Sequence, residues 1–432
     1  MAGMAILVIS VCGFATSFVG QRVETRTEAL KIEYWVAEAQ KRGLPFDAKE
    51  LQDNTVPKFE NAFETVTKLI RDLGHEGRID EAIISFRPTK GKTIPPRLQS
   101  YLDAAKEVSK FKTFDARTDY DLGLFYSCPE HNFYDEMVKA LALDAQQQAL
   151  DGKVDAAIAD LSEARKLEIQ LNHSSELTGG LVIISLDLLL SLTSLQIAEI
   201  CSEHPVDLRK LRNFLAADTP IPDFLKCIRS EFFAGVTTAR NFNQFGGLAG
   251  INGKSSPNLN PSTLVRSGLP SDVEHRNLLA AFIEHSVTIY DYFKSGKNLT
   301  EAGKLANTYR DAIPYSASNG IALRLIPPHY ALDGSLWDQV KIGQEIDRWC
   351  VEILLQKSTS GFPQNVKPRR DPVMGGDLVY MRTDKGFKIF SIGANGVNDG
   401  GPGLDSDGRK NDDIGIEFPF KFSTIRSGRT GP

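Results

Sequence analysis

The hydrophobic pattern of this 432-residue chain changes at Lys357, and that change limits the folds open to it. Upstream, from about residue 25 to 356, apolar residues recur at the three- and four-residue spacing of amphipathic helices. Downstream, the runs Asp377–Arg382 and Gly386–Ile392 alternate apolar and polar side chains, which is typical of paired, half-buried strands. We therefore predict a mainly α protein, in which a large α-helical bundle is followed by a small antiparallel β module.

Helices are expected over the ranges 59–73, 95–108, 133–150, 154–171, 179–200, 271–294, 299–311 and 336–356. The third and fourth of these ranges form a predicted hairpin, broken at Asp151–Gly152. Its second helix carries Ala157, Leu161 and Ala164 at a spacing that resembles a tetratricopeptide repeat. A solenoid needs about three stacked repeats, so we expect this single TPR-like unit to be a hairpin inside a bundle.

The most apolar stretch of the body, 179–200, contains Asp187 near its middle. A lone carboxylate at the centre of a membrane is costly, because lipid offers it neither water nor a partner. We therefore expect this stretch to be the core helix of the bundle rather than a membrane span.

A second apolar run, Ala2–Gly20, has 19 residues without a charge. As a helix it would extend roughly 28 Å, close to the hydrocarbon thickness of a bilayer. We expect residues 1–22 to be a membrane anchor, and two alternatives stay open: a signal peptide cleaved near Ala15–Ser17, or a buried helix. An anchor would make this a single-pass protein of the cell membrane, with most of the chain in the periplasm or outside the cell.

The expected organisation has four parts. Residues 1–22 form the anchor, 23–127 a helical stalk with connecting helices, 128–356 the α-helical bundle with a long loop at 241–270, and 357–432 the β module. Hydrophobic content of 41% and charged content of 24% are ordinary for globular proteins. The net charge of −5 gives no electrostatic case for nucleic acid as a partner.

The segment Gly393–Asp413 lies between the second strand and a third one expected at Ile414–Phe418. Its 21 residues include five Asp, three Asn and six Gly. The segment therefore has too few apolar side chains to become ordered by burying them. Carboxylate and amide oxygens are the ligands that hard cations prefer, and glycines let the backbone bend around an ion. We therefore expect a Ca²⁺ site, with candidate ligands at Asn395, Asn398, Asp399, Asp405, Asp407, Asp412 and Asp413. An EF-hand-type loop at Asp405–Gly408, or an acidic turn without an ion, are the alternatives.

The runs Asp371–Tyr380 (DPVMGGDLVY), Gly386–Gly396 (GFKIFSIGANG) and Asn411–Ile414 (NDDI) resemble, in order and spacing, the C-terminal part of the type II secretion major pseudopilins. In that family this region is a small sheet whose loop binds calcium. The resemblance implies three ligands: a backbone carbonyl at Ile392 or Gly393, and the side chains of Asn395 and Asp413. It covers residues 371–418 only.

The arrangement as a whole is similar to a family of uncharacterised bacterial envelope proteins with an N-terminal anchor, a helical body and a pseudopilin-like tail. The chain departs from the pseudopilins themselves, whose processing site of Gly, Phe and a nearby Glu precedes the apolar helix. Here Gly13–Phe14 lies inside the apolar run, and the first Glu is Glu24.

Cysteines and histidines show no spacing typical of a metal or catalytic site. Cys128, Cys201, Cys227 and Cys350 are too irregular for zinc, and we expect buried free thiols, with up to two disulfides as the alternative. His275 and His285 each follow a Glu on one predicted helix, and we expect both on the surface. The sequence contains no HExxH, Gly-x-Ser-x-Gly, Walker or dinucleotide fingerprint.

These observations favour a non-catalytic, membrane-anchored envelope protein. Its helical body would bind a protein partner, and its C-terminal loop would bind Ca²⁺ for structural stability. Two alternatives remain: a hydrolase acting on an envelope polymer, which would need a cleft with converging carboxylates, and an assembly subunit of a pilus-like or secretion-like system.

Overall fold

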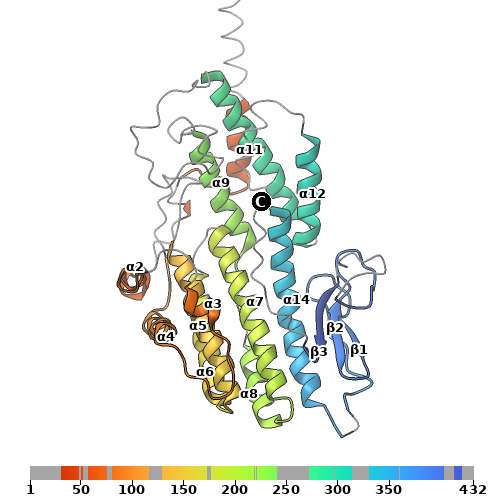
Figure 1. Cartoon of the computed structure of the whole chain (residues 1–432). Coiled ribbons are helices and arrows are strands. Elements are labelled where there is room, and N and C mark those ends of the chain that lie inside the picture. Colours follow the sequence, from red (N-terminus) through yellow and green to blue (C-terminus); the bar gives the residue numbers. More distant parts are fainter. Residues whose placement is uncertain are drawn as a thin grey trace, which may run out of the picture.

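The structure is a computed structural model that describes residues 31–47, 50–51, 57–74, 80–115, 129–172, 177–217, 219, 221–240, 272–296, 298–313, 330–359, 361–402 and 413–420. The expected anchor at 1–22 and the expected loop at 241–270 lie outside these residues. Within them the protein is mainly α-helical, with a small three-stranded antiparallel sheet near the C-terminus (Figure 1). This confirms the fold class at the level of its helical body and its β module.

A helical segment at 31–41 comes first. The elements after it are η2 (Lys58–Glu60), α2 (Phe63–Asp72), α3 (Glu81–Ser85), α4 (Pro96–Val108), α5 (Pro129–Leu150), α6 (Val154–Leu171), α7 (Leu177–Ile200), α8 (Pro205–Ala216), α9 (Phe224–Arg240), α11 (Asp272–Ser295), α12 (Leu299–Ala312), α14 (Tyr330–Leu355), β1 (Val379–Arg382), β2 (Phe387–Ser391) and β3 (Ile414–Phe418). The third strand was predicted at these bounds and is confirmed.

The helical hairpin of α5 and α6 organises the lower half of the body in Figure 1. Gly152 turns the chain between the two helices at a φ of 77°, a left-handed conformation that suits glycine. The predicted apolar stripe of α6, which includes Ala157 and Leu161, is fully buried against its neighbours. We call the apolar cluster that surrounds the hairpin the lower core; it includes Tyr101, Tyr134, Leu161, Trp349 and Phe387.

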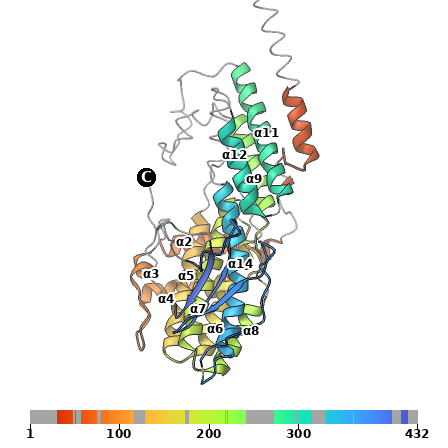
Figure 2. The same ribbon diagram turned by 90° about the vertical axis from the view of Figure 1, so that its right-hand side faces the viewer.

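A second apolar cluster, the upper core, lies among α9, α11, α12 and the segment 31–41 (Figures 1 and 2). Aromatic rings dominate it: Phe224 meets Phe293 and Trp337 edge to face, with ring centroids 5.0 and 4.9 Å away. The indole Nε1 of Trp337 donates to the Pro222 carbonyl at 2.7 Å, which satisfies its buried polar group. Gly235 of α9 faces Phe282 of α11, and a Cβ added at Gly235 would lie 2.1 Å from the Phe282 ring. The two helices therefore approach too closely for a larger residue at position 235.

Two long helices, α7 and α14, run side by side through both halves of the body (Figure 1). Within the described part of the chain, one helix is long and apolar enough to cross a membrane: the stretch Gly179–Ile200 of α7. That stretch lies mostly inside the body, in contact with α5, α6 and α14, which confirms the prediction of a core helix.

The sheet has the order β1-β2-β3 and lies against the C-terminal half of α14 (Figures 1 and 2). Val379 pairs with Phe390, and Ser391 pairs with Ile414. On the side toward the lower core, Phe387 stacks on Phe418 with ring centroids 5.3 Å apart. Arg369, just before the sheet, pairs with Glu345 and Glu352 of α14. Apolar packing and ion pairs therefore both join the β module to the body.

Two sequence predictions differ from the structure. The helix expected from residue 59 begins at Phe63, because the side chain of Asn61 accepts from the Phe63 amide and also bonds to both backbone groups of Asp115. The surface position expected for His285 is wrong: this residue is 5% exposed, with its Nδ1 3.0 Å from the Tyr309 hydroxyl. Because α11 packs against both α9 and α12, few of its side chains reach solvent. The side chain of His275 lies outside the described residues.

The cysteine prediction is confirmed where the structure describes it. Cys201, Cys227 and Cys350 are buried free thiols. Burial raises the pKa of the Cys201 thiol to about 11, which keeps that thiol neutral and unreactive. Cys128 lies outside the described residues.

Candidate functional site

The carboxylate of Asp413 fastens the Gly393–Asp413 loop to the sheet. Asp413 immediately precedes β3 and is 6% exposed. Its Oδ2 accepts hydrogen bonds from the backbone amides of Asp399 at 3.2 Å and Gly401 at 2.8 Å. Gly401 adopts a φ of 95°, which turns the chain back over the sheet. A buried carboxylate with backbone donors is a preformed anionic position, the kind of group around which a cation site is built.

Two asparagines shape the start of the same loop. Asn395 Oδ1 accepts from the amide of Val397 at 2.6 Å, and Asn398 Oδ1 accepts from the amide of Gly400 at 3.0 Å. Both are Asx turns, in which a side-chain oxygen replaces a backbone acceptor. The Nδ2 of Asn395 also reaches Asp399 Oδ2 at 3.4 Å. The described start of the loop, 393–402, is therefore folded in part by its own oxygen-bearing side chains.

The structure brings some of the predicted ligands together. Asn395 touches Asp399, and the backbone of Asp399 touches Asp413, so these three form one connected group. Ile392 and Asn398 lie in the same short segment. The remaining predicted ligands, Asp405, Asp407 and Asp412, lie outside the described residues.

The potential ligand atoms in this group are carboxylate, amide and carbonyl oxygens, which are the atom types that a hard cation binds. Among the residues that the structure describes, there is no cluster of three or more His, Cys, Asp or Glu poised to hold a metal ion. The described loop supplies two carboxylates, those of Asp399 and Asp413. A full coordination shell would draw its further oxygens from 403–412.

One charged residue near the loop was not anticipated from the sequence. Lys388 of β2 donates from its Nζ to the carbonyl of Gly400 at 3.1 Å. A Cβ added at Gly401 would lie 3.1 Å from the Phe390 ring and 3.2 Å from the Lys388 chain. The loop thus covers the Lys388 and Phe390 face of β2, while Phe387 and Ile389 face the lower core. Side chains alternate between the two faces along β2, so the sequence already indicated that Lys388 and Phe390 share the face opposite Phe387 and Ile389.

A second group of interest is a cluster of buried charge in the helical body. Arg165 of α6 donates through Nη1 to Glu168 Oε2 at 2.7 Å, and it also pairs with Asp187 of α7. Gln344 of α14 donates to the same Asp187 oxygen at 3.2 Å. Burial, partly opposed by Arg165, raises the pKa of Glu168 to about 8. In the sequence, only Asp187 inside an apolar helix pointed to this cluster, because a carboxylate there requires a partner.

A further acidic network lies between α4 and α5. The Asp80 carboxylate accepts from Arg97 Nε at 2.6 Å and from the Tyr101 hydroxyl at 3.3 Å. The Asp80 amide in turn donates to Glu136 Oε1 at 2.7 Å. Burial raises the pKa of Glu136 to about 7. Because Asp80 also caps α3 through the Ala82 amide, the network is accounted for by the local helix packing.

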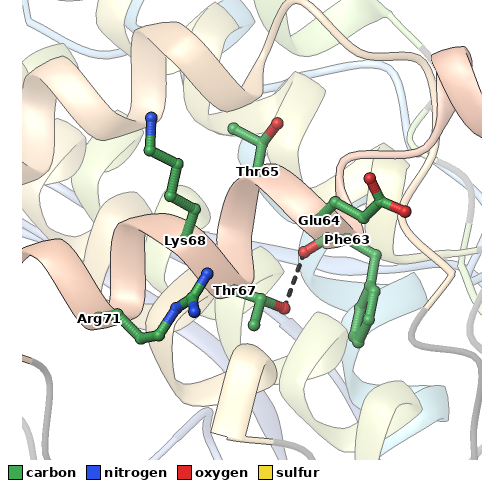
Figure 3. Close-up of a pocket in the computed structure, with 6 residues that line it drawn as sticks. All are labelled: Phe63, Glu64, Thr65, Thr67, Lys68 and Arg71. Atoms are coloured by element: carbon green, nitrogen blue, oxygen red, sulfur yellow. Dashed lines mark hydrogen bonds between the residues drawn. The ribbon is translucent and has the colours of Figure 1, made fainter.

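A surface pocket in the described part of the chain lies on α2 and is open to solvent (Figure 3). Its lining is Phe63, Glu64, Thr65, Thr67, Lys68 and Arg71. The hydroxyl of Thr67 is turned back to the Phe63 carbonyl of the same helix at 2.9 Å. One carboxylate lines this pocket, whereas acid catalysis on a polymer uses a facing pair of carboxyl groups. Glu168 and Asp347, two carboxyls with raised pKa, lie in the core instead.

Comparison of the chain with protein-family models, with curated proteins and with solved structures finds no match. A function for this protein must therefore be argued from its own residues and contacts.

Proposed function

We propose that this chain is a non-catalytic, membrane-anchored envelope protein whose C-terminal loop binds Ca²⁺ and is stabilised by it. The helical body would present the surface that a protein partner binds. The observation that carries the proposal is the position of Asp413, a buried carboxylate that gathers the backbone of Asp399 and Gly401 at the edge of the sheet.

Calcium is the preferred ion because the donors of this loop are oxygens held on a bending, glycine-rich backbone. Ca²⁺ takes six to eight oxygen ligands in flexible geometry, whereas Mg²⁺ demands a near-ideal octahedron. Bound Ca²⁺ would offset the repulsion between the carboxylates of Asp399 and Asp413. It would also tie 403–412, where three more acidic candidates lie, to the sheet. The role of the ion in this proposal is structural.

The start of the body suits a chain that emerges from a membrane. The helical segment 31–41 lies along α11 (Figure 2). Lys31 pairs with Glu284 at 3.1 Å, and Arg42 pairs with Asp291 at 2.8 Å. These pairs hold the segment 31–42 against α11, so a membrane anchor at 1–22 would be followed closely by a part of the chain that is fixed to the body.

Thermal unfolding of the full chain tests the calcium claim. With Ca²⁺ at about a hundred times its dissociation constant, binding to the folded state alone stabilises by roughly 2.7 kcal/mol. We expect the melting temperature to rise with Ca²⁺ and to fall again when a chelator is added. Mg²⁺ at the same concentration should have a smaller effect.

The variant Asp413→Asn makes the test specific. It keeps an oxygen that can accept the amides of Asp399 and Gly401 but removes the charge, so the Ca²⁺-dependent rise should disappear. Asp384→Asn is the matched control, because Asp384 is exposed in the β1–β2 turn of the same module and its variant should respond like the natural protein. A wild-type melting temperature that changes with neither Ca²⁺ nor chelator would overturn the proposal.

A further inference from the structure

The upper and lower cores meet on α7 and α14, the two helices that they share. On α7, Ile184 belongs to the upper core and Leu186 to the lower core. On α14, Val340 belongs to the upper core and Ile342 to the lower core. The two cores overlap along α7 from Val182, which packs on the lower core, to Leu188, which packs on the upper core. Asp187 lies within this shared stretch, so a charged group lies where the two halves of the body join.

The cluster at this boundary holds more acids than bases. Arg165 pairs directly with the carboxyls of Glu168 and Asp187, which are 1% and 3% exposed. Asp347 of α14, also 3% exposed, lies near enough for the charges of Asp187 and Arg165 to act on its carboxyl. Arg348 lies on the rim, where its Nε donates to the Leu215 carbonyl and its Nη1 lies 3.6 Å from Glu345.

If every carboxyl of the cluster were ionised, one guanidinium would face three negative charges out of contact with water. Uncompensated charge in a core is strongly unfavourable, and a carboxyl in that position takes up a proton instead. Protons are therefore the available counter-charge.

We propose that this cluster is a proton-controlled joint: protons held on Glu168 and Asp347 lock the two cores together, and their release in alkaline solution loosens α7 and α14 at the boundary. The joint lies where α7 contacts both α6 and α14, so ionisation there pushes α7 away from its neighbours at the helices that both cores share. It is independent of the cation loop and of the proposed anchoring.

The charged groups around the two carboxyls set the direction of the effect. Burial raises the pKa of Glu168 to about 8, with Arg165 opposing and Asp187 adding to the rise. Burial likewise raises the pKa of Asp347 to about 7, opposed by a hydrogen bond from Ser191 and by the charges of Arg165 and Arg348, and reinforced by Asp187.

Both folded-state pKa values lie above those of the unfolded chain. The stabilising effect of the bound protons is therefore complete below the unfolded values of 4.5 and 3.8, and it is lost progressively as the pH rises from there through about 7 for Asp347 and about 8 for Glu168.

Amide hydrogen exchange of the full chain, followed from about pH 6 to about pH 9 and corrected for intrinsic rates, measures the joint directly. Up to about pH 7 to 8, the opening constant of α7 and α14 amides near the boundary should grow about tenfold per pH unit for each proton that opening releases, and above these folded-state pKa values it should level off. The double variant Glu168→Gln, Asp347→Asn carries permanently neutral groups of the same shape, and its opening constant should stay flat over that range.

Glu136→Gln is the matched control, because Glu136 is a buried glutamate with a raised pKa that lies in the lower core, away from the boundary. This variant should keep the wild-type response of α7 and α14. A double variant that retains the wild-type slope would overturn the proposal. If the double variant does not fold, the wild-type protein alone still tests the proposal. An opening constant that depends on pH no more strongly at the boundary than in α11 would contradict a joint there.

Discussion

Individual ionisable side chains inside the cores give this protein opposite sensitivities to acid and to base. Glu168 is held in its protonated form, so it favours the folded state at low pH. His131, near the start of α5, is held neutral: it is 1% exposed, and neither ring nitrogen has a hydrogen-bond partner among the described residues. Its ring lies beside Phe114, with centroids 6.0 Å apart, in an apolar setting that disfavours the imidazolium.

His131 should therefore limit stability in acid. Burial lowers its pKa from 6.5 to about 4, below that of the unfolded chain. As the pH falls from about 6.5 to about 4, His131 takes up a proton in the unfolded state but stays neutral in the folded state. The free energy of unfolding therefore declines by roughly 3 kcal/mol. We expect His131→Leu to flatten this part of the profile, as measured by urea unfolding at a series of pH values. His204→Gln, at an exposed position, is the control, and an equal acid slope in all three proteins would contradict the assignment.

At the scale of single elements, local signals in the sequence predicted much of what is observed. Helix α6 has the predicted bounds, because Asp151–Gly152 breaks the chain before it and its apolar stripe is complete. The start of α2 was predicted too early, since the contacts of Asn61 with Asp115 span 54 residues and leave no local signature. The burial of His285 was missed for the same reason: which faces of α11 are covered depends on helices far away in the sequence.

The docking of the β module on α14 should depend on Phe387. This ring is 0% exposed and stacks on Phe418 beneath the sheet, so Phe387→Ala leaves a cavity between two elements. We expect a loss of roughly 3–5 kcal/mol in the free energy of unfolding, measured by urea titration. Met381→Ala on β1, where the side chain is 41% exposed, should change stability by less than about 0.5 kcal/mol. Similar small changes for both variants would mean that the module does not depend on this contact.

At the scale of the whole molecule, the path of α7 and α14 through both cores decides how the protein is held together. The sequence showed that α7 is apolar on nearly all sides, which predicts a central helix, but it could not show which helices surround it. The buried cluster at the boundary was equally hidden, because Arg165, Asp187 and Asp347 are distant in sequence and meet only through tertiary packing. Composition alone was sufficient to select the Gly393–Asp413 loop, and the structure adds the hydrogen bonds that Asp413 accepts from it.

The central claim is that this loop binds Ca²⁺, and isothermal titration calorimetry of the full chain with CaCl₂ tests it most directly. We expect saturable binding at one site per chain, abolished in Asp413→Asn and preserved in Asp384→Asn. Binding that survives unchanged in Asp413→Asn, or no binding heat at any temperature tried, would contradict it.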